Sequence, residues 1–246
     1  YGSFEFRKFS LIGDPALDLA FPKQQVITDS VNGVSINATI DTLKALSKVT
    51  VSGYIADENG NILPNYNGFV FPTVFDKKQV LNTLGNKSPA YIYGFDVQKS
   101  TLYKGKATVE NGRFEFSFVV PKDINYTFGA GKISYYAFNG TEDATGYSSD
   151  VTIGGTDPNA SQDNVGPEVS LYLNNESFVS GGITDEEPTL YASLFDSNGI
   201  NTTGNGIGHD LTAVIDENTS KAIVLNTYYE SDPDSYQSGK VIFPME

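Results

Sequence analysis

The side chains most often used in catalysis are scarce in this sequence. Its 246 residues include no cysteine and a single histidine, His209, which is followed by Asp210. A carboxylate beside an imidazole can orient it and raise its basicity, as in half of a general-base pair. No nearby serine or threonine lies in a Gly-x-Ser-x-Gly context, and a lone histidine lacks the second histidine of an ordinary zinc site. We therefore predict a structural role for His209 and no catalytic residue in the chain.

Two acidic turns could offer calcium the hard oxygen ligands that it prefers. Neither turn completes the spacing of an EF-hand loop. We therefore expect an Asx-rich β-turn at the first and a solvated acidic cluster at the second, with calcium binding as the alternative and no other cofactor. The side chains concerned are Asp57, Asn59 and Asn61 in the first turn and Asp185, Glu186 and Glu187 in the second.

The elements that carry these turns are predicted to be strands. Apolar and polar residues alternate with a period of 2 rather than 3.6, which is typical of strands with one buried face. The 15 Tyr and 16 Phe suit packed sheets, and the 24 Gly and 11 Pro supply frequent turns. The chain is therefore predicted to be all-β, with little helix.

Two hairpins are read most clearly. Residues 101–120 form one, because Asn111-Gly112 tolerates the positive φ angles of a type I′ turn. Three of its aromatic side chains would share one face, at Phe114, Phe116 and Phe118. A second hairpin is expected over residues 48–64. Further strands are predicted at 68–75, 90–97, 132–138, 148–153, 168–173, 189–196, 211–216 and 221–229.

The stretch 156–167 has almost nothing to bury and contains two prolines, so we predict a linker there. It separates a first β-sandwich (26–155) from a smaller immunoglobulin-like β-sandwich (168–246). The predicted fold is thus two tandem antiparallel β-sandwiches, the second immunoglobulin-like. A last strand begins at Val241. If that sandwich needs strands after Glu246, an open sheet edge remains and an edge-strand dimer of the fragment is expected.

Composition also limits the partners. With 30 acidic and 16 basic side chains the net charge is −14, which opposes binding to nucleic acid or anionic lipid surfaces. The absence of cysteine excludes disulfides and thiolate metal sites. No run approaches the roughly 18 to 20 apolar residues of a membrane-spanning helix. Since the sequence opens on Tyr1-Gly2-Ser3 without an initiator Met, we expect an excised piece of a larger protein.

Several segments carry a family resemblance. Residues 9–20, Phe-Ser-Leu-Ile-Gly-Asp-Pro-Ala-Leu-Asp-Leu-Ala, resemble the Leu-x-Gly-Asp-Pro-Ala-Leu-x-Leu segment that closes the caspase-like domain of gingipain-type cysteine peptidases. Residues 1–25 would then be the tail of such a peptidase domain. Nearly all the remaining chain is similar to the β-domains of the type IX secretion sortase family, through residues 41–49, 71–76, 119–124, 131–136 and 199–210.

The resemblance implies a function for the parent protein. That family consists of outer-membrane-associated cysteine endopeptidases of Bacteroidota, which remove the C-terminal sorting signal of secreted cargo and join the cargo to lipopolysaccharide. The catalytic Cys and His would belong to the caspase-like domain, and His209 does not match the catalytic position. This segment would be exported through the periplasm to the cell surface or outer membrane. There it would act as a scaffold and dock cargo C-terminal signal domains or other secretion-system subunits.

A different class of function fits the same composition. A non-enzymatic surface adhesin or glycan-binding protein would also use acidic β-sandwiches, and its exposed tyrosines could stack on sugars. What lies upstream of Tyr1 would distinguish the two hypotheses, because only the sortase family requires an α/β domain with a His and a Cys there.

Overall fold

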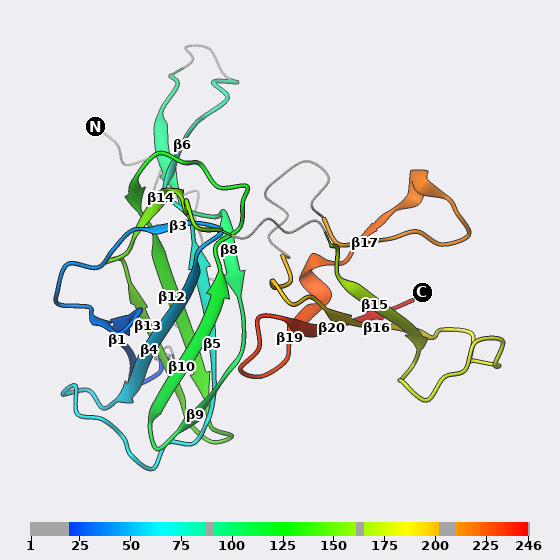
Figure 1. Cartoon of the computed structure of the whole chain (residues 1–246), viewed down its shortest axis with the longest axis horizontal. Helices are drawn as coiled ribbons and strands as arrows, with labels where there is room; N and C mark the ends of the chain where they lie inside the picture. Colours follow the sequence, from blue (N-terminus) through cyan, green and yellow to red (C-terminus); the bar gives the residue numbers. More distant parts are fainter. Residues whose placement is uncertain (1–19, 87–90, 161–164, 202–209, 246) are drawn as a thin grey trace, which may run out of the picture.

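A computed structural model describes residues 20–86, 91–160, 165–201 and 210–245 (Figure 1). Its regular structure is strands β1 to β20, with two single-turn 3-10 helices, η2 (Thr219–Lys221) and η3 (Asn226–Tyr228), and no α-helix within these residues. The prediction of an all-β chain with little helix is confirmed. Correspondingly, none of the described helices could cross a membrane.

Seven strands form a sheet that closes on itself. Their order around the ring is β12-β13-β1-β4-β10-β9-β5, and β5 pairs again with β12 over seven residues, from Phe75 opposite Lys132 to Phe69 opposite Phe138. All pairings are antiparallel except β1 with β13. The strands are β1 (Gln24–Val31), β4 (Lys48–Ala56), β5 (Gly68–Phe75), β9 (Ala107–Glu110), β10 (Arg113–Val119), β12 (Lys132–Phe138) and β13 (Asp143–Ser148).

This closed barrel stands where we expected the first β-sandwich. A sandwich keeps the edges of its two sheets open, whereas here both edges of β5 and of β12 are paired. Shorter strands complete the region. β2 (Val34–Ser35) pairs with β1, β8 (Thr101–Lys104) pairs with β5 beside β9, and a three-stranded sheet holds β11 (Gly129–Ala130), β14 (Thr152–Thr156) and β3 (Leu43–Ala45).

Aromatic rings from β10 fill much of the barrel core. The predicted turn is present, with φ of 51° at Asn111 and 74° at Gly112, and β9 and β10 pair through it. The predicted hairpin of residues 101–120 is confirmed only over 107–119, because residues 101–104 form the separate strand β8, which pairs with β5. Because alternate residues of a strand face the same side, β10 buries three phenylalanines together. They are Phe114, Phe116 and Phe118. The second predicted hairpin is reduced to the single bridge Ala56–Ile62 after β4.

The seam between β13 and β1 depends on a glycine. A side chain at Gly146 would overlap the backbone carbonyl oxygen of Val26 on β1. Gly146→Ala is therefore expected to push the two strands apart and lower the free energy of unfolding by about 2 kcal/mol, measured by urea denaturation. Gly166→Ala is the control, because no heavy atom lies within 4 Å of the added methyl group. Equal losses in the two variants would contradict the steric explanation.

The second region contains a four-stranded antiparallel sheet in the order β15-β16-β20-β19. Its inner face packs under a two-stranded ladder, β17 (Thr212–Ala213) with β18 (Ile223–Val224), around the buried residues Leu194, Leu225 and Val241. An immunoglobulin-like sandwich stays a prediction for this region. The strands of the sheet are β15 (Glu168–Leu173), β16 (Thr189–Phe195), β19 (Tyr229–Ser231) and β20 (Ser238–Pro244).

The last strand, β20, lies inside its sheet, whereas the open edges are elsewhere. β20 pairs with β16 on one side and with β19 on the other, so the edges of this sheet are β15 and β19. An edge-strand dimer stays a prediction, since β15 and β19 each keep one edge without a strand partner among the described residues. The predicted boundaries at 1–25, 26–155, 156–167 and 168–246 stay predictions, and residues 1–19 and 161–164 lie outside the described residues.

A two-stranded ribbon projects from one end of the barrel. Strands β6 (Gln79–Asn82) and β7 (Gly94–Val97) pair only with each other, antiparallel, and form the arm at the top of Figure 1. The pattern predicted the strand that ends at Val97 but not its partner β6.

Candidate interaction surfaces

The described residues assemble no metal cluster. Among them, no group of three or more His, Cys, Asp and Glu side chains lies close enough to hold a metal ion. His209, the only histidine, lies outside the described residues, and its neighbour Asp210 is exposed.

The first candidate calcium turn is closed by its own hydrogen bonds. Asp57 Oδ1 accepts the backbone N–H groups of Asn59 at 2.8 Å and Asn61 at 2.9 Å, and Asp57 Oδ2 accepts Asn61 Nδ2 at 3.0 Å. The bonds from the Asn61 side chain and backbone lower the pKa of Asp57. The contacts are those of the expected Asx-rich turn. Calcium binding here stays a prediction.

The second candidate turn is a solvent-exposed loop between β15 and β16. Asp185, Glu186 and Glu187 are all exposed. The Thr184 hydroxyl donates to Asp185 Oδ1 at 3.4 Å and itself accepts Asn174 Nδ2 at 3.1 Å. This arrangement is that of a solvated acidic cluster, and calcium binding stays a prediction here too.

A groove of about 550 Å³ lies between the barrel and the four-stranded sheet. Strand β8 and the end of β10 line it on the barrel side, and β19 lines the other side. Both β8 and β19 lie at the ends of their strand orders, so each has one edge without a strand partner among the described residues. Prominent side chains of its lining are Leu102, Tyr103, Phe118, Tyr229, Ser231 and Tyr236.

The groove combines aromatic walls with positive charge. Lys48, Lys104 and Lys122 line it, are exposed, and form no ion pair with a described acidic side chain. Lys48 Nζ lies 5.3 Å from the centroid of the Tyr236 ring, within cation–π range. Three lysines and one acidic residue, Asp123, line the groove, in contrast with the net charge of −14 for the whole chain. The groove therefore suits a partner that carries negative charge.

One buried polar atom in the groove lacks a partner. Ser231 is 5% exposed, and its hydroxyl makes no hydrogen bond to any described residue. An unpaired buried hydroxyl costs about 1–3 kcal/mol, and this oxygen is too buried to meet a partner docked in the groove without local movement. Beside it, burial raises the pKa of Tyr229 well above its usual range, and the protonated phenol donates to the Ser238 carbonyl at 3.3 Å.

Polar contacts hold the two sides of the groove together. Asp234 accepts Thr108 N at 2.7 Å and the Thr108 hydroxyl at 2.6 Å. Lys106 Nζ lies 2.9 Å from Glu230 Oε1, and this bond lowers the pKa of the Glu230 carboxyl. These contacts join β9 and the chain before it to β19 and the turn after it. They hold the barrel and the second region together beside the groove.

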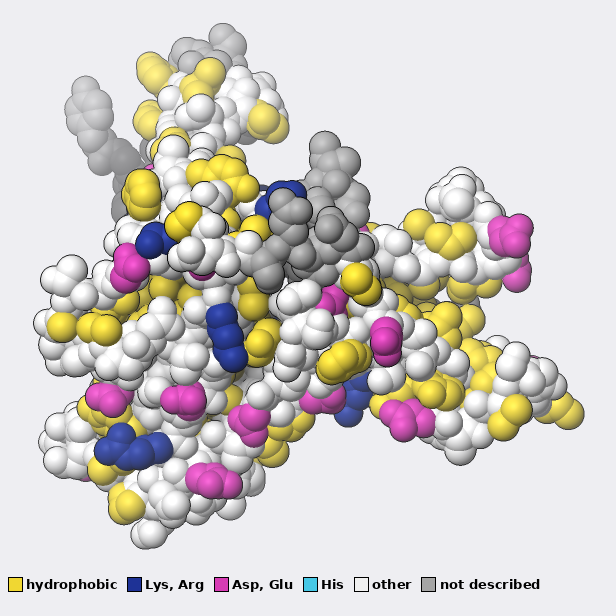
Figure 2. Space-filling model, in the orientation of Figure 1, with side chains coloured by type: hydrophobic (Ala, Val, Ile, Leu, Met, Phe, Trp, Pro, Cys, Tyr) yellow, Lys and Arg dark blue, Asp and Glu magenta, His cyan; other side chains and the backbone are white. Residues whose placement is uncertain are grey.

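The second surface is the β6–β7 ribbon, which is apolar and exposed. Leu81 pairs with Phe95, and Val80 pairs with Asp96 on the opposite face. Beyond the strands, Thr83 N donates to the Tyr93 carbonyl at 3.0 Å, which extends the ribbon toward its turn. Figure 2 shows apolar side chains along this arm. Their exposed fractions are Val80 68%, Leu81 38%, Leu84 84%, Tyr91 68%, Ile92 67%, Tyr93 64% and Phe95 48%.

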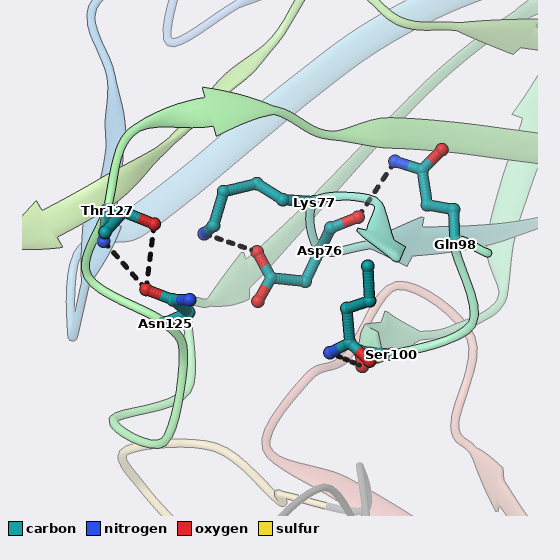
Figure 3. Close-up of polar contacts among 7 residues, drawn as sticks. Asp76, Lys77, Gln98, Ser100, Asn125 and Thr127 are labelled. Carbon is teal, nitrogen blue, oxygen red and sulfur yellow. Dashed lines mark hydrogen bonds and ion pairs between the residues drawn. The ribbon is translucent and has the colours of Figure 1, made fainter. Parts of the chain in front are cut away.

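A polar network anchors the base of the ribbon to the barrel (Figure 3). Asp76, which is 6% exposed, pairs with Lys77 Nζ at 2.6 Å. Gln98 Nε2 donates to the Asp76 carbonyl at 2.8 Å, and Asp76 N donates to the Ser100 carbonyl at 2.8 Å. Gln79 Nε2 reaches the Ser100 hydroxyl at 3.2 Å. The two chain ends of the ribbon are therefore fixed to each other and to the end of β5.

The chain resembles a solved structure over most of its length. The chain is similar to the dimeric latent form of PorU from Porphyromonas gingivalis, at 33% sequence identity and a TM-score of 0.59 over 95% of this chain. The match covers 22% of the PorU chain, so this sequence spans about a fifth of that protein. The likeness supports the family resemblance over nearly the whole chain.

Other comparisons add little. The C-terminal domain of the Streptococcus pyogenes antigen I/II-family protein AspA aligns with 91% of this chain and 84% of its own, but at 12% identity and a TM-score of 0.25, which is too low to show a shared fold. No protein-family model and no curated protein matches the chain.

Proposed function

We propose that this chain is a non-catalytic segment of a sortase-like cysteine peptidase of the type IX secretion system. The observation that carries the proposal is the likeness to PorU at 33% identity over 95% of the chain. The sequence has no cysteine, so a cysteine nucleophile would come from another part of the parent protein. The segment would position that part and hold partners beside it.

The parent protein would act at the cell surface or outer membrane. There it would remove the C-terminal sorting signal from secreted cargo and join the new carboxyl end to lipopolysaccharide. The chain spans only 22% of PorU, so we propose this activity for the parent protein and not for the segment alone.

The groove between the barrel and the four-stranded sheet is the proposed docking site for a cargo signal domain or another secretion-system subunit. Its volume of about 550 Å³ is within the usual range for binding sites, roughly 300–1,000 Å³. The free edges of β8 and β19 suit an extended segment that adds as a strand. Lys104 on β8, together with Lys48 and Lys122, supplies positive charge for an acidic segment.

The test is to mix the purified chain with a cargo C-terminal signal domain and measure both binding and cleavage. We expect binding by calorimetry without cleavage by mass spectrometry. Lys104→Glu should weaken binding about tenfold, because it places a negative charge in the groove. Lys23→Glu is the matched control, since Lys23 is exposed and does not line the groove. Cleavage by the chain alone would refute the non-catalytic role, and equal weakening by both variants would refute docking in the groove.

A further inference from the structure

We propose that the β6–β7 ribbon is a membrane-docking arm, which inserts its apolar side chains into the interfacial layer of a lipid bilayer. The arm is defined by the described residues 79–86 and 91–97. The arm lies apart from the groove, and its exposed side chains, its attachment to the barrel and its charges all bear on its role.

Both faces of the arm carry apolar side chains, although Asn82 and Asp96 share the face of Val80. Leu81 and Phe95 lie on one face, and Val80 on the other. Toward the turn, Ile92 and Tyr93 are each about two thirds exposed. A flat protein surface, such as a second copy of this chain, would cover one face and leave the other in water. A bilayer surrounds an inserted ribbon on all sides, so it can cover both faces.

The free edges of the arm limit how deep it goes. An isolated two-stranded ribbon is marginally stable in water, and unpaired backbone groups are not tolerated in the hydrocarbon core. The headgroup layer still supplies water and polar groups to those edges. Each four-residue strand is about 13 Å long, enough to reach the 5–10 Å depth of interfacial segments. Tyrosines suit this layer, because their rings are apolar and their hydroxyls polar.

Few charges lie along the arm. Among the described residues of 79–97 the only charged side chain is Asp96, which lies near the base, and the sequence adds Lys87 between the two strands, outside the described residues. Lys78 and Lys99 flank the base and are exposed, and Lys77 is used in the Asp76 ion pair. Lysines at that level can reach lipid phosphates. The net charge of −14 opposes anionic bilayers, so the apolar side chains must drive docking and a zwitterionic bilayer suffices.

The contacts at the base of the arm fix its position relative to the barrel. Two buried or half-buried groups, Asp76 and Gln98, fix its ends to the barrel through the contacts given above. A ribbon held in this way keeps its apolar side chains displayed instead of collapsing them onto the barrel. Insertion therefore needs little extra ordering of the chain, which lowers the entropic cost of binding.

Co-sedimentation of the full chain with phosphatidylcholine vesicles tests the arm. We expect the protein to bind, and Ile92→Ser to lower the partition coefficient about tenfold, which corresponds to about 1.4 kcal/mol of lost apolar burial. Ile183→Ser is the matched control, because Ile183 is fully exposed but lies in the loop between β15 and β16. It should change partitioning less than about twofold. No binding by the unmodified chain, or equal losses in both variants, would overturn the proposal.

A tryptophan reporter measures depth. The sequence has no Trp, so Ile92→Trp introduces a single one. Its emission should shift to the blue on vesicles, with stronger quenching by lipids brominated near the headgroup than by lipids brominated near the chain ends. Sedimentation velocity without lipid tests the alternative, in which a second copy of this chain covers the arm. Concentration-dependent dimers that Ile92→Ser abolishes, together with no vesicle binding, would show that a second copy covers the arm.

Discussion

Replacing Phe116 by alanine is expected to lower the free energy of unfolding by about 4 kcal/mol, the usual cost of deleting a large core side chain. Phe116 is 3% exposed. Its ring centroid lies 5.8 Å from that of Tyr103, 6.2 Å from Phe118 and 6.4 Å from both Phe114 and Tyr135. Removing the ring opens a cavity at the meeting point of four aromatic side chains from three strands, and urea denaturation monitored by circular dichroism measures the loss.

Phe138→Ala provides the control for this variant. Phe138 is on β12 of the same barrel, but its side chain is 43% exposed. Its removal should cost less than about 1 kcal/mol, because most of the lost area was already in contact with water. Equal losses for the two variants would mean that the aromatic cluster does not dominate the stability of the barrel.

Local pattern was enough to locate several strands. The alternation of apolar and polar residues predicted β5 (Gly68–Phe75), β12 (Lys132–Phe138) and β15 (Glu168–Leu173) with the bounds that the structure gives. The Asn111-Gly112 turn was equally readable, because few residues other than Asn and Gly accept positive φ at two successive positions. These features depend on neighbours in the sequence, and so the sequence carries their signal.

Closure of the barrel carried no such signal. A strand with one buried face shows the same alternation in a sandwich and in a barrel, so the pairing of β5 with β12 could not be read from either segment. Strand β1 was missed, although Val26 and Val31 are buried, because polar residues interrupt its pattern. The predicted strand at 148–153 was wrong, since the structure ends β13 at Ser148 and begins β14 at Thr152.

The interaction surfaces could be predicted least. Lys48, Lys104 and Lys122 come from separate segments, and only the pairing of the barrel strands brings them to one end of the barrel, where the second region forms the other wall of the groove. In the arm, an apolar run such as Tyr91-Ile92-Tyr93 indicates a buried strand when read alone. Its exposure follows from the absence of any neighbouring layer among the described residues, which no local pattern encodes.

Alkaline pH is expected to destabilise the fold steeply. Burial raises the pKa of Tyr135 and of Tyr229 well above the usual value of about 10. In the unfolded chain both phenols ionise above pH 10, while in the folded chain they stay protonated. The stability that they contribute is thus complete below pH 10 and declines as the pH rises toward the folded pKa values, approaching about 1.4 kcal/mol per pH unit for each tyrosine. Tyr66, whose pKa burial raises to about 12, adds to the decline.

The decline can be assigned to one phenol by substitution. Tyr135→Phe should cost about 1–3 kcal/mol at pH 9, because the Thr28 hydroxyl loses its 2.8 Å hydrogen bond to Tyr135 and is left buried. The same variant should lose stability between pH 10 and pH 11.5 less steeply, by about 1.4 kcal/mol per pH unit. Tyr147→Phe, on the exposed face of β13, should leave the slope unchanged. Urea denaturation at half-unit pH steps measures these slopes. Parallel curves for the unmodified chain and Tyr135→Phe would mean that the Tyr135 phenol is no harder to ionise in the barrel than in the unfolded chain.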